Sequence, residues 1–222
     1  MKLVLCGQKS FGRDVLKLLR AKGHEIIMVV APDHDSQRLE PLRAEAEDLK
    51  IVILNSLTSD KLPNDIDLIV TAHSHCFLSK KCRDKTRLGA IGYHPSLLPL
   101  HRGRDAVYWT IRDKDKIAGG SVYWLNETVD GGDIAASSWC FVLPDDTLNT
   151  LWRRELYPMG LRLLGHVIDE ISMGIIRSEP QNPDLATWEP SVSSRPRLYR
   201  PELLTITTGG GANAHVRSRA ML

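Results

Sequence analysis

A histidine and an aspartate stand in two segments of the chain whose residue types suit proton transfer. His94 belongs to the segment GAIGYHPSLLPLHRG, and Asp130 belongs to the segment SVYWLNETVDGGD. An imidazole can supply a proton to a leaving group, and a carboxylate can orient that imidazole or accept a proton from a nucleophile. These residue types make His94 and Asp130 candidate site residues.

Each of the two residues also has a simpler structural interpretation. A lone histidine at the end of a buried strand commonly hydrogen-bonds to the backbone, and Asp130-Gly131 is a common turn dipeptide. The surroundings of His94 favour function, because Pro95 and Pro99 stiffen a segment that leaves a strand end. Open α/β sheets place their chemistry at such ends.

The elements that must position this pair follow from the apolar pattern of the first hundred residues. Short strand-like runs alternate with amphipathic ones, which predicts βαβ units and a parallel sheet. Apolar residues recur at helical spacing in FGRDVLKLLRAKG, and Gly23 ends that helix. The predicted strands are KLVLC, HEIIMVV, IVIL, DLIVTA and GAIGYH.

The pattern changes after Gly119. The runs GSVYWLN and IAASSWCFV are strand-like and close in sequence, so we expect an antiparallel pair and a mixed sheet. Asp145 and Asp146 precede a long apolar-periodic stretch and are expected to cap a helix there. Pro158 is expected to kink or divide that helix.

Composition bounds the class of protein. The 222 residues carry 29 basic and 27 acidic side chains, which leaves a net charge of +2 and no electrostatic footprint for nucleic acid. The four cysteines show no CxxC spacing, and the chain opens on MKLVLCG without a leader pattern. We therefore expect a cytoplasmic protein with free thiols. No apolar run approaches the length of a membrane helix, so no membrane association is expected.

The domain organisation is predicted from a change of character after Ser178. We expect one catalytic domain over residues 1–178 and an extended C-terminal tail over residues 179–222, where prolines recur. The last dozen residues, which follow a glycine triplet, are expected to be poorly ordered.

The residue spacing does not support two other kinds of site, a nucleotide-binding loop and a metal site. GQKSFG after the first strand lacks the glycine pattern of a nucleotide-binding loop. The candidate metal ligands fit no tight zinc pattern, so we expect no metal. These candidates are His73, His75, Cys76, His94, His101 and Asp130.

The segment HPSLLPLHRG, followed by VDGGD, resembles the signature of the folate-dependent formyltransferase family. Within this family, the run from YHPSLLPLHRG to DDTLNTLW is most similar to the N-terminal hydrolase domain of 10-formyltetrahydrofolate dehydrogenase. The resemblance is strong over about residues 65 to 176 and absent beyond about residue 190. It implies a Rossmann-like α/β formyltransferase fold with helices on both faces of a mostly parallel, twisted sheet that has an antiparallel portion. It also implies 10-formyltetrahydrofolate as formyl donor, lying across the carboxyl ends of the strands.

The resemblance gives roles to the pair. His94 would stabilise the developing oxyanion and protonate the leaving amine, and Asp130 would act on the side of the attacking nucleophile. Arg102 and Arg104 would contact the folate tail or be solvated.

A departure from the family pattern lies two residues before His94. Most transferring members read Asn-x-His, whereas this chain has Gly92 there. On a strand, Gly92 faces the same side as His94, so an amide that would reach the formyl oxygen is missing. Loss of one such donor costs about 2.7 to 4 kcal/mol of transition-state stabilisation unless it is replaced. The hydrolase domain also lacks this asparagine, which favours water as acceptor by analogy.

The folate site is likewise implied by the resemblance. The pterin would lie against Cys76, Phe77 and Leu78 and against the loop from Asn126 to Val129. A flat heterocycle needs an apolar slot with backbone donors and acceptors, although Phe77 and Leu78 are equally well explained as ordinary core. His75 stands where the family usually has an apolar residue, so it is a further candidate beside the substrate.

Three functions remain open at this stage. The preferred one is hydrolysis of 10-formyltetrahydrofolate to tetrahydrofolate and formate. The second is transfer of the formyl group to a small amine, such as an amino sugar or a hydroxylamine. The third is a folate-binding protein without catalysis, against which the presence of both His94 and Asp130 argues. The oligomeric state is left open, with a homo-oligomer allowed.

Overall fold

The computed structural model describes residues 1–33 and 40–192. The chain forms two compact units. The first unit contains Met1–Tyr93 and Leu164–Ile175, and the second contains His94–Leu163 and the described residues from Ile176 onward. The final dozen residues, for which we expected poor order, lie outside the described part.

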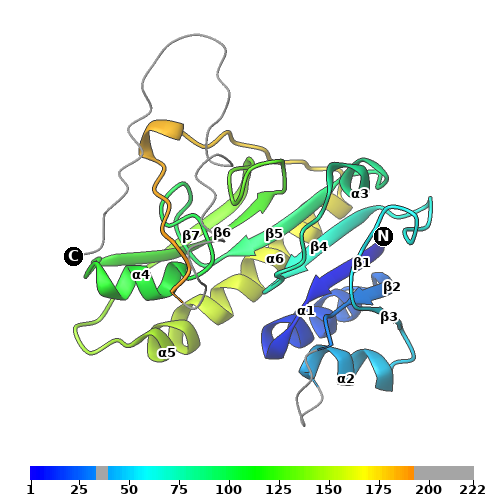
Figure 1. Ribbon diagram of the computed structural model, residues 1–222, viewed down its shortest axis with the longest axis horizontal. Coiled ribbons are helices and arrows are strands. Elements are labelled where there is room, and N and C mark those ends of the chain that lie inside the picture. Colours follow the sequence, from blue (N-terminus) through cyan, green and yellow to red (C-terminus); the bar gives the residue numbers. More distant parts are fainter. Residues whose placement is uncertain (34–39, 193–222) are drawn as a thin grey trace. The chain divides into compact units, whose positions relative to one another are not determined.

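The first unit is built on five parallel strands, which run from blue to green in Figure 1. Their order is β3-β2-β1-β4-β5. The central strands β1 and β4 are almost wholly buried, as continuous apolar runs in a parallel sheet require. The bounds are β1 Lys2–Gly7, β2 Glu25–Val30, β3 Val52–Leu54, β4 Leu68–Ala72 and β5 Ala90–His94.

Three helices connect these strands: α1 Lys9–Ala21, α2 Pro41–Asp48 and α3 Lys80–Asp84. Helix α1 buries the predicted apolar stripe, and its end is closed by Gly23, whose φ of 80° suits glycine. Helix α2 begins at Pro41, and the Glu40 side chain accepts a hydrogen bond from Arg43 N as its cap.

The second unit contains the antiparallel pair, β6 Ile117–Trp124 and β7 Ile134–Phe141, with helix α4 Ala106–Arg112 before it. Five parallel strands and one antiparallel pair confirm the predicted fold class of a mostly parallel sheet with an antiparallel portion.

The long helical stretch is interrupted, as Pro158 predicts. Helix α5 Leu148–Leu151 runs into a π-helical turn, η1 Trp152–Leu156, and α6 Tyr157–Ser172 follows. The expected cap is wrong by one residue, because the Thr147 hydroxyl accepts from Thr150 N. Asp146 instead accepts hydrogen bonds from Leu143 N and the Thr150 hydroxyl. A short 3-10 turn, η2 Pro183–Leu185, lies further on.

The core of the second unit brings α4, β6, β7 and the helices after β7 together. Its buried members are Val107, Ala118, Cys140, Leu151, Leu156 and Met159. Gly119 on β6 lets a loop approach closely, since a Cβ there would lie 2.5 Å from both Leu97 Cγ and Ser138 O. The segment that follows His94 is thereby packed onto β6.

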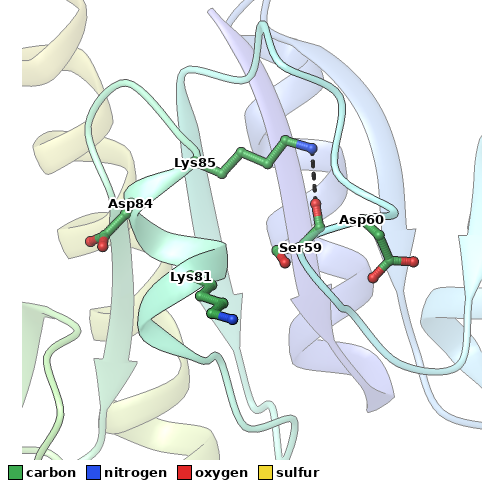
Figure 2. A pocket seen from close by; sticks show the side chains of 5 residues that line it. All are labelled: Ser59, Asp60, Lys81, Asp84 and Lys85. Atoms are coloured by element: carbon green, nitrogen blue, oxygen red, sulfur yellow. Dashed lines mark hydrogen bonds between the residues drawn. The ribbon is translucent and has the colours of Figure 1, made fainter.

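An open depression on the first unit is lined by Ser59, Asp60, Lys81, Asp84 and Lys85, as Figure 2 shows. Lys85 Nζ donates to the Ser59 carbonyl at 2.9 Å. None of the predicted site residues lines this depression, so we assign it no chemistry.

Two further features match the composition. The four cysteines are free thiols. Within residues 1–33 and 40–192, no helix has the length and apolar character needed to cross a bilayer.

Candidate active site

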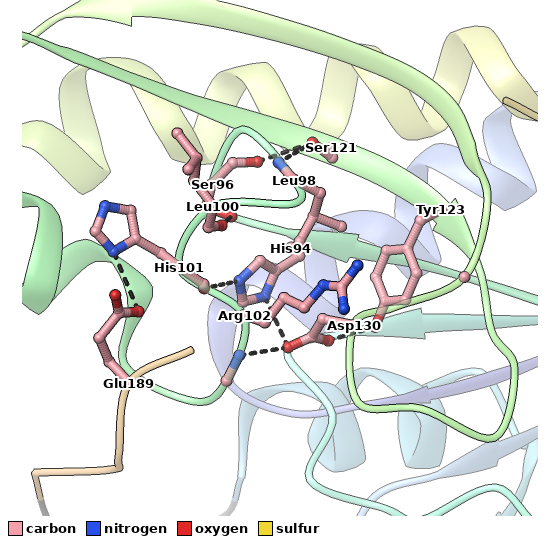
Figure 3. Close-up of polar contacts among 12 residues, drawn as sticks. His94, Ser96, Leu98, Leu100, His101, Arg102, Ser121, Tyr123, Asp130 and Glu189 are labelled. Atoms are coloured by element: carbon pink, nitrogen blue, oxygen red, sulfur yellow. Dashed lines mark hydrogen bonds and ion pairs between the residues drawn. The ribbon is translucent and has the colours of Figure 1, made fainter. Parts of the chain in front are cut away.

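His94 is the last residue of β5, and hydrogen bonds hold the loop that follows it (Figure 3). The imidazole is buried, with 7% of the residue exposed. The Ser96 hydroxyl donates to Leu100 O at 2.6 Å, and the Ser121 hydroxyl donates to Ser96 O at 2.8 Å. Leu98 N in turn donates to the Ser121 hydroxyl at 3.1 Å. These bonds fix the loop that shapes the surroundings of His94.

One ring nitrogen of His94 is committed to the backbone. Nε2 lies 2.7 Å from the carbonyl oxygen of His101. A carbonyl can only accept, so Nε2 carries a proton. The nitrogen that remains for chemistry is Nδ1, which lies 3.6 Å from Asp130 Oδ2. This separation is longer than a hydrogen bond, but a water molecule can contact both atoms at once.

The carboxylate of Asp130 is held at both oxygens. Gly103 N donates to Oδ2 at 2.8 Å, and the Tyr123 hydroxyl donates to Oδ1 at 2.6 Å. Burial, followed by the charge and hydrogen bond of Asp130, raises the pKa of Tyr123 well above its usual value. Tyr123 therefore stays a protonated donor, and Figure 3 shows its hydroxyl directed at the carboxylate.

The loop after Asp130 needs its glycines. Asp130 itself has a left-handed φ of 50°, which aspartate tolerates better than most residues. A Cβ on Gly131 would lie 2.1 Å from Thr128 Oγ1, and one on Gly132 would lie 1.7 Å from Trp124 O. The sequence DGGD thus forms a tight loop that directs the Asp130 carboxylate toward His94.

Arg102 is not solvated, which was one of the two roles expected for it. The residue is 5% exposed, and its guanidinium donates to Gln181 Oε1 from Nε at 3.1 Å and from Nη2 at 2.7 Å. Burial lowers its pKa, and the charge of Asp130 opposes that shift. Arg102 is thus a buried structural cation. Arg104, in contrast, is exposed.

His101 ties the same loop to the C-terminal segment. Nε2 lies 2.7 Å from Asp115 Oδ2, and Nδ1 lies 3.2 Å from Glu189 Oε2. Burial alone would lower the pKa of His101, but hydrogen bonds and charges of Glu189 and Asp115 raise it above its usual value. His101, Asp113 and Glu189 also place ligand atoms within 4.8 Å of one another, as a metal site would. Both ring nitrogens of His101 face carboxylates, so a protonated imidazole accounts for its contacts with Asp115 and Glu189.

The remaining candidates of the first unit lie within β5 or in the segment after β4. Gly92 is buried on β5 and pairs in register with Thr71 on β4. His75 follows β4, and its Nδ1 lies 3.2 Å from Gln8 Nε2. Cys76 is half-buried, Leu78 is buried, and Phe77 is 80% exposed, which leaves the Phe77 ring outside the core.

The candidates of the second unit include the loop between β6 and β7. Asn126 and Val129 are exposed there. Asn126 Oδ1 accepts from Thr128 N at 2.8 Å and from the Thr128 hydroxyl at 2.7 Å, so this side chain shapes the loop. Within the second unit, His94 and Asp130 are the predicted residues that the structure brings together.

Sequence reasoning missed Tyr123 and Gln181. Tyr123 carried a weak signal, because it is a polar-tipped aromatic in the strand that leads to Asp130. Gln181 carried none, since it is one polar residue in a proline-containing segment.

Comparison with known proteins identifies the family of this chain. A family model described as formyl transferase matches residues 1–158. The chain belongs to the formyl transferase family. This confirms the family expected from the motifs.

Two sequence relatives illustrate the match. Cytosolic 10-formyltetrahydrofolate dehydrogenase of Xenopus laevis is 33% identical over 202 residues, covering 86% of this chain and 22% of that protein. Methionyl-tRNA formyltransferase of Lactobacillus delbrueckii is 30% identical over 204 residues, covering 86% of this chain and 64% of that protein. The chain thus spans about a fifth of the length of the dehydrogenase relatives.

A solved structure supports the fold. The N-formyltransferase from Helicobacter canadensis, in complex with folinic acid and dTDP-3-aminofucose, superposes with a TM-score of 0.69 at 16% identity. The superposition covers 85% of this chain and 70% of that chain. It confirms that this formyl transferase family member has the formyltransferase fold.

Proposed function

We propose that this chain removes the formyl group of 10-formyltetrahydrofolate by hydrolysis, giving tetrahydrofolate and formate. The observation that carries the proposal is the pairing of His94 Nδ1 with Asp130 Oδ2 at 3.6 Å, with the carboxylate fixed by two donors. The 10-formyltetrahydrofolate dehydrogenase relative supports a folate substrate by its name.

The reaction requires one proton to move from the attacking water molecule to N10 of the leaving folate. A water molecule in contact with both Asp130 Oδ2 and His94 Nδ1 attacks the formyl carbon and gives its proton to the pair. The carbonyl oxygen becomes negative in the tetrahedral intermediate. Protonation of N10 by His94 then lets the carbon–nitrogen bond break, so formic acid leaves and loses its proton to the solvent as formate, and the pair returns to its starting state.

The oxyanion must be stabilised without the asparagine that most transferring members have at the position of Gly92. His94, once protonated at Nδ1, supplies positive charge close to the reacting carbon, and the negative charge of Asp130 stabilises that imidazolium. A second donor beside Gly92 would be a backbone N–H or a bound water molecule. A bound water molecule contributes less than a preorganised amide and would give a modest rate.

The folate would use the candidates outside the pair. We assign the pterin to the segment Cys76 to Leu78 and to the loop from Asn126 to Val129, with His75 as a polar neighbour. The 80% exposure of Phe77 supports this assignment, because an aromatic ring left in solvent can stack on a flat heterocycle.

Transfer to a small amine is the second candidate function. The N-formyltransferase from Helicobacter canadensis, solved with dTDP-3-aminofucose, favours a small amine, and the methionyl-tRNA formyltransferase supports formyl transfer in general. In this reaction the amine takes the place of the water, and Asp130 accepts the proton that the amine loses.

Several coarser expectations belong to the same proposal. Residues 1–178 would form the catalytic domain, and residues 179–222 would form a tail attached to it. A cytoplasmic location is favoured by the cytosolic relatives, although mitochondrial 10-formyltetrahydrofolate dehydrogenases also match. The expected partners are the folate and, in the second candidate function, an amine.

An isotope experiment separates the two functions. The purified protein is incubated with 10-formyltetrahydrofolate in ¹⁸O-enriched water, with and without an amino sugar. Hydrolysis puts one ¹⁸O atom into the formate, and we expect this product in both reactions. Formation of a formylated amine at the expense of formate would instead support transfer.

A further inference from the structure

The described residues after Ser178 run against both loops that carry the proposed catalytic pair. Thr187 Oγ1 accepts from His101 N at 2.7 Å, and Arg102 N donates to Thr187 O at 3.0 Å. A Cβ on Gly103 would lie 2.9 Å from Glu189 O, so this segment also closes over the residue whose amide binds Asp130. The segment from residue 179 to residue 192, here called the strap, is part of the site's framework.

Gln181 is the strap residue that joins the two loops. Its Nε2 donates to Asp130 O at 2.8 Å and to Gly132 O at 2.6 Å. Its Oε1 accepts from the Arg102 guanidinium at 2.7 and 3.1 Å. The amide thus uses both donors and its acceptor, and no other uncharged side chain of its length offers this combination.

These hydrogen bonds lie at the residue whose backbone conformation is least common in the loop. Asp130 has a left-handed φ, and such a conformation persists only when its surroundings over-determine it. Gln181 holds the carbonyls of Asp130 and Gly132, which lie on either side of Gly131 in this loop. A rotation of this loop would move Oδ2 away from His94 Nδ1.

We propose that Gln181 is a positioning residue for the reaction assigned above, on which this inference rests. Gln181 sets the Asp130 carboxylate beside His94 by anchoring the Asp130–Gly132 loop to Arg102. The strap, which sequence reasoning assigned to an appended tail, thereby supplies a residue on which catalysis depends.

The first test monitors the surroundings of the His94 ring and does not require turnover. In full-length protein containing ¹³C-labelled histidine, the His94 Cε1 resonance is assigned by its loss in His94→Gln. We expect Gln181→Leu and Gln181→Glu to move this resonance. Gln181→Glu still accepts from Arg102 but cannot donate to the two carbonyls. Leu185→Ala is the matched control, because Leu185 lies in the strap and is 60% exposed. An unmoved resonance in both Gln181 variants would overturn the proposal.

The second test reads the reaction. Misplacement of a reacting group by about 1 Å can cost about 100-fold in rate, so we expect Gln181→Glu to lower kcat by about 10- to 100-fold. Affinity for folinic acid should be unchanged, which separates positioning from loss of the binding site.

A double-mutant cycle with Asp130→Asn completes the design, measured in single turnovers. If Gln181 acts through Asp130, Gln181→Glu costs little once Asp130 is changed. Equal losses in both backgrounds would contradict the positioning role. Wild-type protein that neither hydrolyses nor transfers the formyl group would refute the proposed function, while the resonance of His94 still decides the role of Gln181.

Discussion

His94 and Asp130 face each other with Nδ1 3.6 Å from Oδ2, while the opposite ring nitrogen of His94 is bound to the carbonyl of His101 at 2.7 Å. The backbone therefore selects which nitrogen is used. Because Nε2 is committed to a carbonyl, Nδ1 beside the carboxylate is the nitrogen available for proton exchange in the proposed reaction. This relationship underlies the predictions below.

Tyr123→Phe removes the hydroxyl that donates to Asp130 Oδ1 at 2.6 Å. A hydrogen bond to a charged group is worth about 1.5 to 3 kcal/mol, so we expect kcat to fall by about tenfold to a hundredfold. Tyr108→Phe, at a tyrosine that is 36% exposed, is the matched control and should retain full activity. Steady-state rates of tetrahydrofolate release provide the comparison. An unchanged kcat in Tyr123→Phe would show that Asp130 does not need this donor.

Gly132→Ala tests the tight loop after Asp130. The new Cβ would lie 1.7 Å from Trp124 O, so the backbone must shift. We expect a loss of about 3 kcal/mol in the free energy of unfolding and a marked loss of activity. Urea denaturation followed by far-ultraviolet circular dichroism measures the stability.

Gly165→Ala is the control for that variant. Gly165 lies in helix α6, and its added Cβ would lie 3.1 Å from the end of the flexible Lys22 side chain. Alanine also has the higher helix propensity, so equal or greater stability is expected. Equal stabilities of the two alanine variants would argue against the loop geometry.

His101 makes stability depend on pH. Its pKa is raised in the folded protein by Glu189 and Asp115, which outweigh burial. A raised pKa contributes stability that is fully present below the unfolded value near 6.5 and is lost as pH rises through the folded value. We expect His101→Gln to destabilise the protein more at pH 6 than at pH 9. Urea midpoints at both pH values test this, and an equal loss at both would remove the ion-pair interpretation.

Much of the fold could be predicted because local patterns carried it. The apolar runs of β1, β4 and β5 and the stripe of α1 match the structure, since buried parallel strands and amphipathic helices have distinct periods. The N-terminal cap of helix α5 was harder to predict. Asp146 and Thr147 are adjacent, and both residue types are preferred at helix N-caps; Thr147 takes the cap, while Asp146 accepts hydrogen bonds from Leu143 N and the Thr150 hydroxyl.

The candidate site was predictable only in part. His94 and Asp130 stand in recognisable motifs, and the structure brings their side chains together. Tyr123, Arg102 and Gln181 depend on contacts between segments far apart in sequence. No local pattern distinguishes a buried arginine bound to a glutamine from a solvated one, so the expectation of a solvated Arg102 was wrong.

The most direct test of the central claim is the release of tetrahydrofolate from 10-formyltetrahydrofolate with no amine acceptor, followed by absorbance. Wild-type protein should turn over, and general acid and base catalysis is typically worth about 10² to 10⁴ in rate. His94→Ala and Asp130→Asn should therefore each lose at least about 100-fold in kcat while still binding folinic acid. Full turnover in either variant would contradict the assignment of the pair.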